Sequence, residues 1–212
     1  MAYPFSKRGA CEKEGKRSVD SDLAESVAAL KDIFSRRGIN ATFGKADVAV
    51  VEELRKTLRV PSRFRSFLLA ADPVDVETVA PVERVRLFPA ARIAAEQTKP
   101  DGAVLPPSWR KTWIIIGRSA LLGDPYFLDA AKLDAEGDCP VFTSMMGTDS
   151  VKPVLCASSL QQFLRILTTS MEVATGFGSG VLDDDDEAIF REALSPKIKT
   201  IDSAALRAGH WT

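Results

Sequence analysis

The sequence predicts a fold of the α+β class, in which runs of helices and runs of strands are separated along the chain. Apolar residues recur at helical spacing over residues 22–71 and again over residues 159–173, whereas apolar and polar residues alternate over much of residues 74–145. The length of 212 residues suits one domain with appendages or two small domains. A content of 45% hydrophobic and 27% charged residues is typical of a globular chain.

The N-terminal third predicts a basic arm followed by three helices. Residues 1–19 carry five cationic side chains and two glycines, so we expect a flexible arm there. A helix is expected over residues 22–37, because an acidic pair with capping-box spacing opens it and a glycine follows it. Apolar stripes predict two more helices, over residues 47–59 and 61–71.

The central region predicts strands joined by loops. Alternating, β-branched and aromatic residues predict five strands, over residues 74–76, 85–87, 112–117, 125–130 and 140–145. A short Ala-rich helix is expected over residues 89–97, and a loop rich in proline and glycine over residues 99–108.

The last third predicts a strong helix, a hinge and a tail. The helix covers residues 159–173, and a Gly-rich hinge follows at residues 176–180. Four carboxylates at residues 183–186 are placed to open a helix that Pro196 ends. Three apolar residues beyond it indicate that the tail packs on the domain. We therefore expect an arm, a single domain over residues 20–175, and a packed tail over residues 176–212.

Charge and residue usage exclude several classes of function. The 28 lysines and arginines nearly cancel the 29 acidic residues, and a pI near 6.0 argues against sequence-independent nucleic-acid binding. A single histidine, His210, excludes chemistry that needs two imidazoles. No zinc-ligand pairs at short spacing and no phosphate-binding loop occur in the sequence, so we expect no cofactor or metal.

Cysteine usage and hydropathy predict the compartment. The three cysteines are odd in number and contain no Cys-x-x-Cys pair, which favours reduced thiols. The basic N-terminus is followed by no apolar stretch, and no run approaches the roughly 20 residues that cross a bilayer. We therefore expect a cytoplasmic protein that does not bind membranes.

An ordered set of motifs links the chain to a known family. In chain order these are V-E-E-L-R-K-T-L-R-V-P, F-R-S-F-L, I-G-R-S-A-L-L-G-D-P-Y-F-L-D, V-F and S-S-L-Q-Q-F-L. Over about residues 45–170, this order resembles the SUKH superfamily, which includes fungal cell-wall-assembly regulators and bacterial toxin-immunity proteins. The chain departs from the family pattern in its N-terminal helix, in its tail beyond residue 172, and in a less polar turn over residues 118–122.

The resemblance implies a mixed, largely antiparallel sheet packed with helices, and no catalytic residues. For a bacterial member it also implies that the chain binds and neutralises a cognate toxin, often a nuclease or a deaminase, in the producing cell. A regulatory or scaffold module, as in the fungal branch, is an alternative. A small hydrolase or nucleotide-binding enzyme is a further one, because carboxylates surround the Gly123-Asp124 hairpin.

Charge along the chain points to a partner. Residues 84–118 hold seven cations and two carboxylates, whereas residues 119–150 hold six carboxylates and one lysine. If the acidic hairpins lie on one rim, they form a surface that suits a basic protein such as a toxin. The predicted partner-binding residues are Trp109, Asp124, Tyr126, Asp129, Asp134 and Asp138. Each also has a structural interpretation, because aspartates form turns and aromatic residues fill cores.

Overall fold

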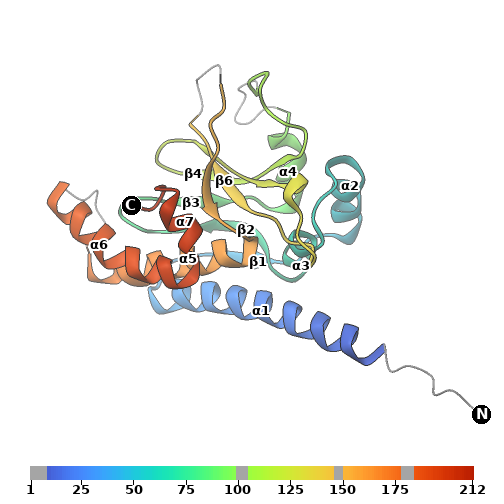
Figure 1. The fold of residues 1–212 in the computed structure, drawn as a ribbon, viewed down its shortest axis with the longest axis horizontal. Coiled ribbons are helices and arrows are strands. Elements are labelled where there is room, and N and C mark those ends of the chain that lie inside the picture. The colour runs from blue at the N-terminus through green and yellow to red at the C-terminus, as the bar shows by residue number, and fades with distance from the viewer. Residues whose placement is uncertain (1–8, 99–104, 146–149, 178–183) are drawn as a thin grey trace, which may run out of the picture.

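The computed structural model describes residues 9–98, 105–145, 150–177 and 184–212. Within these ranges the chain forms one antiparallel sheet covered by helices, which confirms the α+β class (Figure 1). The strands are β1 (Thr42–Gly44), β2 (Asp72–Glu77), β3 (Val85–Leu87), β4 (Trp113–Ser119), β5 (Pro125–Asp129), β6 (Val141–Thr143) and β7 (Val154–Ala157). The helices are α1 (Gly9–Arg36), α2 (Val48–Leu58), α3 (Ser62–Ala71), α4 (Ala90–Glu96), α5 (Leu160–Val173), α6 (Asp184–Ile201) and α7 (Ser203–Arg207).

The sheet is a meander. Its spatial order is β1-β2-β3-β4-β5-β6-β7, and each described pair of neighbours is antiparallel. The mixed sheet that the family resemblance implies is therefore not observed in the described chain. In a meander the connections alternate between the two ends of the sheet. The β2–β3, β4–β5 and β6–β7 connections share one end, which we call the turn end, and the β3–β4 and β5–β6 connections leave from the opposite end.

Helices cover both faces of the sheet. On one face, α5 packs against the strands, and the ring centroids of Phe163 and Tyr126 lie 5.4 Å apart. Helix α1 packs on the outer side of α5, where Arg37 donates a hydrogen bond of 3.1 Å to the carbonyl of Met171. On the other face, α4 lies against β4, and α2 packs on α4. The core fills the layers on both sides of the sheet.

The predicted strands are all present, and the structure adds two short ones. β1 and β7 are edge strands of three and four residues, and their sequences lack the alternation that marks a half-buried strand. Each has only one neighbour in the sheet. They become strands because β2 and β6 present unpaired backbone groups to them, which is a tertiary effect.

Helix α1 begins at Gly9, so residues 9–19, which the sequence analysis assigns to a flexible arm, are helical. Its N-terminal part extends away from the sheet (Figure 1). Six of the eleven residues 9–19 are alanine, glutamate, lysine or arginine, which favour helix and outweigh Gly15. The predicted capping pair therefore lies within the helix, where the Ser26 hydroxyl donates to the Asp22 carbonyl at 2.9 Å. Residues 1–8 lie outside the described residues.

Helix α6 does not end at Pro196, as predicted, but continues to Ile201. Proline lacks an N–H and cannot donate to the carbonyl four residues earlier, that of Glu192. Both Glu192 and Pro196 are exposed, so water can solvate this carbonyl. Nearby hydroxyls add hydrogen bonds, because Ser195 donates to the Arg191 carbonyl at 2.7 Å and Thr200 to the Pro196 carbonyl at 3.1 Å. Of the four carboxylates predicted to open this helix, residue 183 lies outside the described residues.

The segment after α6 packs along β7. Asp202, 5% exposed, caps α7 by accepting hydrogen bonds of 3.0 Å from the amides of Ala204 and Ala205. The same carboxylate accepts from the amide and hydroxyl of Ser158, at the junction of β7 and α5, at 2.5 and 3.1 Å. Trp211, 3% exposed, donates from its indole nitrogen to the Cys156 carbonyl of β7 at 2.8 Å. The C-terminal segment is thus attached at both ends.

None of the described helices has the length and apolar character that crossing a membrane requires.

We predict that Asp202→Ala lowers the free energy of unfolding by about 3 kcal/mol, because it leaves several buried donors without an acceptor. Asp47→Ala is the matched control, since Asp47 caps α2 at an exposed position through the Ala49 amide alone and should cost about 1 kcal/mol. Urea denaturation of both variants measures the difference. Equal costs would contradict the assigned role of Asp202.

Candidate functional site

The turn end of the sheet holds a large hollow. A groove of about 840 Å³ lies between the β4–β5 turn, the ends of β6 and β7, and residues 208–212. It forms there because the antiparallel register brings three connections to this end and the C-terminal segment runs beside them. We call this hollow the groove.

Exposed apolar side chains border the groove. Leu122 is 76% exposed and Met145 is 73% exposed, and Leu121 beside them is 46% exposed. The turn is held from within, because the Ser119 hydroxyl accepts hydrogen bonds from the amides of Leu121 and Leu122 at 3.3 and 3.1 Å. Gly123 closes it with φ +77°, a conformation that favours glycine. A fixed turn thus presents two leucines to solvent.

A polar cluster lies beneath the groove. The Tyr126 hydroxyl and the His210 Nε2 share a hydrogen bond of 2.9 Å. Burial lowers the pKa of His210 to about 4, and the positive charge of Arg191 acts in the same direction. Burial also raises the pKa of Tyr126 well above its usual value, and the nearby carboxylate of Glu83 adds to the rise. Both side chains are therefore neutral near pH 7.

Glu83 connects this cluster to the groove. Its carboxyl group lines the groove and also a smaller cavity of about 200 Å³ next to it. Burial raises the pKa of Glu83, whereas hydrogen bonding with Ser119 and Tyr126 opposes that rise. Its Oε1 is buried and finds no hydrogen-bond partner among the described residues. A buried acceptor without a donor costs free energy, so a ligand that supplies an N–H would bind here favourably.

Two of the six predicted binding residues lie at this site. Asp124 lines the groove and is partly exposed. Tyr126 lies below it with no exposed surface, so it supports the site through His210 and cannot itself touch a partner.

Three of the predicted aspartates have structural roles at or near the opposite end of the sheet. Asp129 accepts hydrogen bonds from the Ala131 amide at 3.2 Å and the Thr112 hydroxyl at 3.3 Å. Asp134 holds the β5–β6 connection by accepting from the amides at positions 136 and 138. Asp138, 3% exposed, accepts from the Leu160 amide at 3.0 Å and so caps α5. Burial raises the pKa of Asp138, and its backbone hydrogen bonds oppose the shift.

Trp109 belongs to an aromatic cluster on the α4 side of the sheet. Its ring lies 5.3 Å from that of Trp113 and 4.9 Å from that of Phe127, both in edge contacts. It is only partly buried and covers the cluster from outside. The structure does not bring Trp109 to the groove.

The acidic hairpins do not share one rim. Asp124 follows the β4–β5 turn at the turn end, whereas Asp134 and Asp138 lie in the connection at the opposite end. Consecutive hairpins of a meander must diverge in this way, because each strand carries the chain across the sheet. Asp124 and Asp129 are five extended residues apart, about 16 Å. Paired carboxylates that act on one bond lie about 5 to 9.5 Å apart, so these two are not such a pair.

Two of the cysteines, Cys139 and Cys156, lie in surroundings that do not favour a reactive thiolate. Cys139 and Cys156 are buried, and burial raises the pKa of both thiols. A reactive cysteine needs the opposite shift. Within the ranges that the structure describes, no cluster of three or more His, Cys, Asp or Glu residues could hold a metal ion.

Several groove residues were not predicted from sequence. Leu122 and Met145 were not selected, although the apolar character of the β4–β5 turn is visible in the sequence. No sequence signal marks Glu83 or Arg191, because the sequence does not show that the β2–β3 connection meets α6 and the tail. The sequence does not show that His210 reaches the sheet, because no local pattern places the tail beside Tyr126.

Models of known protein families give no match to this sequence, and curated proteins give no similar sequence.

We predict that the free energy of unfolding falls as pH decreases from 6.5 towards about 4, because the unfolded chain protonates His210 while the folded chain keeps it neutral. The decrease in the free energy of unfolding that His210 alone causes is at most about 3 kcal/mol. Burial raises the pKa of Glu83, Asp72 and Asp138, so these carboxyl groups stabilise the folded chain as pH falls through the same range, and the effect of His210 is therefore the difference between the parent and a variant that lacks the histidine.

Denaturation of the parent and of His210→Gln between pH 4 and 7.5 isolates the histidine. The variant should lose the decline below pH 6.5, since glutamine does not titrate but can still pair with the Tyr126 hydroxyl. Parallel curves for the two proteins would contradict the buried, neutral histidine.

Proposed function

We propose that this chain is a non-catalytic protein-binding domain whose contact surface is the groove and the β4–β5 turn. We further propose that it is a cytosolic bacterial immunity protein, which binds and neutralises a cognate toxin. The second statement rests on the SUKH resemblance of the ordered motifs, and the first rests on the geometry of the groove.

The observation that carries the proposal is the exposed apolar turn at the border of the groove. Leu122 at 76% and Met145 at 73% exposure lie at the edge of one concave surface. Internal hydrogen bonds fix the turn, so binding costs little ordering entropy. Large apolar side chains on a fixed, concave surface are typical of protein-binding sites.

The charged groups of the groove add selectivity. The buried Oε1 of Glu83 has no donor among the described residues, and Asp124 adds a second carboxylate to a groove that Lys152 and Arg191 also line. A lysine or arginine of the partner would satisfy Glu83, so a basic toxin surface fits this part of the groove. The sequence predicts a basic partner from a single acidic rim, whereas in the structure this preference rests on Glu83 and Asp124. Neutralisation would follow by occlusion, with the turn covering the substrate cleft of the toxin.

We predict that Leu122→Asp weakens binding of the cognate toxin at least about 30-fold, because it places a charge where an apolar anchor is desolvated. Leu133→Asp is the matched control, since Leu133 is 53% exposed and lies in the β5–β6 connection, which leaves from the opposite end of the sheet. Calorimetry with the product of the neighbouring toxin gene, and survival of cells that express that toxin, measure the effect.

The control variant should bind and protect as the parent does. Equal loss for both variants, or full affinity of Leu122→Asp, would contradict the proposed surface. Failure of the parent to protect cells from any toxin encoded beside it would contradict the immunity role.

A further inference from the structure

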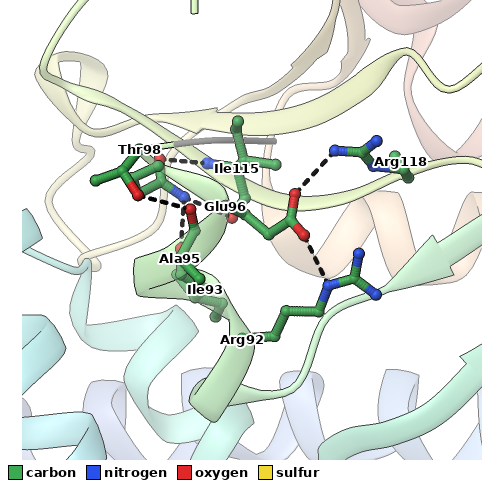
Figure 2. A network of polar contacts seen from close by, with 8 residues as sticks. Arg92, Ile93, Ala95, Glu96, Thr98, Ile115 and Arg118 are labelled. Carbon is green, nitrogen blue, oxygen red and sulfur yellow. Dashed lines mark hydrogen bonds and ion pairs between the residues drawn. The ribbon is translucent and has the colours of Figure 1, made fainter. Parts of the chain in front are cut away.

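Side chains cover the sheet at two places where a strand has no strand neighbour. β3 ends at Leu87, so the backbone of Ile115 in β4 has no strand partner on that side. The side-chain amide of Gln97 takes that place, donating to the Ile115 carbonyl and accepting from its amide, both at 3.1 Å (Figure 2). At the β7 edge, the indole of Trp211 donates to the Cys156 carbonyl at 2.8 Å. The β1 edge differs from both.

Phe43 of β1 presents its backbone groups to the open side of the sheet. It lies directly opposite Pro73 of β2, and proline has no N–H to donate to β1. The pair is therefore of the non-hydrogen-bonded kind, in which the N–H and C=O groups point away from the partner strand. Among the described residues, neither backbone group of Phe43 has a hydrogen-bond partner. An extended segment beside β1 would find one donor and one acceptor there.

A hollow adjoins this edge on the face that carries the Phe43 ring. It has a volume of about 370 Å³ and lies between β1, residues 39–41 and the C-terminal part of α1. The ring of Phe34 lies 6.1 Å from that of Phe43, and the Lys31 Nζ lies 5.2 Å from the centre of the Phe43 ring. Lys31 is exposed and forms no ion pair within the described part of the chain. The hollow thus offers an ammonium group to a carboxylate from a segment beside β1.

The other face of this edge presents an apolar side chain. Gly44 follows Phe43 and therefore faces the other side of the sheet. A Cβ at Gly44 would lie 3.1 Å from the Val74 Cγ2, so the missing side chain leaves Val74 uncovered, and Val74 is 53% exposed. The carboxylate of Asp75, which pairs with Thr42, also lies on this face and so does not neutralise Lys31. An apolar side chain of an added strand would cover Val74.

A second copy of this chain does not suit the edge. Pairing β1 with β1 would bring the exposed Lys31 and Lys45 of one copy towards the same two lysines of the other, and like charges across an interface oppose association. Nearby carboxylates already have partners, because Asp32 accepts a hydrogen bond from Arg36 at 2.6 Å and Asp47 caps α2. The edge therefore favours a segment that carries negative charge.

We propose that the β1 edge binds an extended segment of a protein partner in which acidic side chains alternate with apolar ones. The segment adds a strand to the sheet, pairs with the backbone of Phe43, directs an acidic side chain towards Lys31 and covers Val74 with an apolar one. This surface goes beyond the proposed function, because β1 and β7 form opposite edges of the sheet and the groove lies at the β7 side.

The test uses the full chain, labelled with nitrogen-15, and two capped hexapeptides. One peptide alternates glutamate and valine, and the other alternates lysine and valine. The glutamate peptide should shift the amide signals of residues 40–45 in a saturable way and slow hydrogen exchange at the Phe43 amide, because this N–H gains an acceptor. The lysine peptide should bind at least about fivefold more weakly. No saturable shift, equal binding of the two peptides, or shifts confined to the groove would overturn the proposal.

Two charge reversals test the role of Lys31 in the same titration. Lys31→Glu should weaken binding of the glutamate peptide about fivefold. Lys111→Glu is the matched control, since Lys111 is also exposed, has no ion pair among the described residues and lies just before β4. It changes the net charge equally and should leave binding unchanged. Equal affinities of the two variants would overturn the proposal.

Two further measurements separate the alternatives. Leu122→Asp should bind the glutamate peptide as the parent does, so failure at the β1 edge and failure at the groove are distinguishable. Sedimentation of the chain alone should show no dimer that involves β1. A stable dimer with slow exchange at the Phe43 amide would overturn the proposal, because a second copy would then occupy the edge.

Discussion

Each described strand pairs only with its neighbours along the chain, in antiparallel register, and this pairing decides where every side chain of interest lies. Each strand carries the chain from one end of the sheet to the other. Consecutive connections therefore lie at opposite ends of the sheet, and every second connection lies at the same end. The β2–β3 and β4–β5 connections therefore bring Glu83 beside Asp124 at the groove. The same rule sends Asp134 to the other end, where it stabilises a connection.

The C-terminal segment completes the site. Asp202 and Trp211 attach it to the edge strand β7, and His210 between them reaches the buried Tyr126. The groove thus has one wall of sheet connections and one wall of tail, joined by a neutral tyrosine–histidine pair. A change that detached the tail would therefore remove one wall of the groove.

The class of fold and the five central strands could be predicted from the sequence, because each depends on local spacing. β1 and β7 were missed because pairing with a neighbour makes them strands. Pro196 was misread because solvent and nearby hydroxyls, which no local rule includes, let α6 continue. At the site, sequence could not separate Asp124 from Asp138, since both are aspartates near turns and only the fold buries one under α5.

The antiparallel pairing also decides which charged side chains lie near the β4–β5 turn. Two carboxylates, those of Glu83 and Asp124, line the groove together with Lys152 and Arg191, and the β4–β5 turn beside them has an apolar tip. Hydrogen–deuterium exchange of the chain, alone and saturated with the proposed partner, tests this surface most directly. The account predicts slower exchange in residues 119–125 and 208–212 and no change in residues 133–138. Protection confined to residues 133–138, with the β4–β5 turn unchanged, would contradict it.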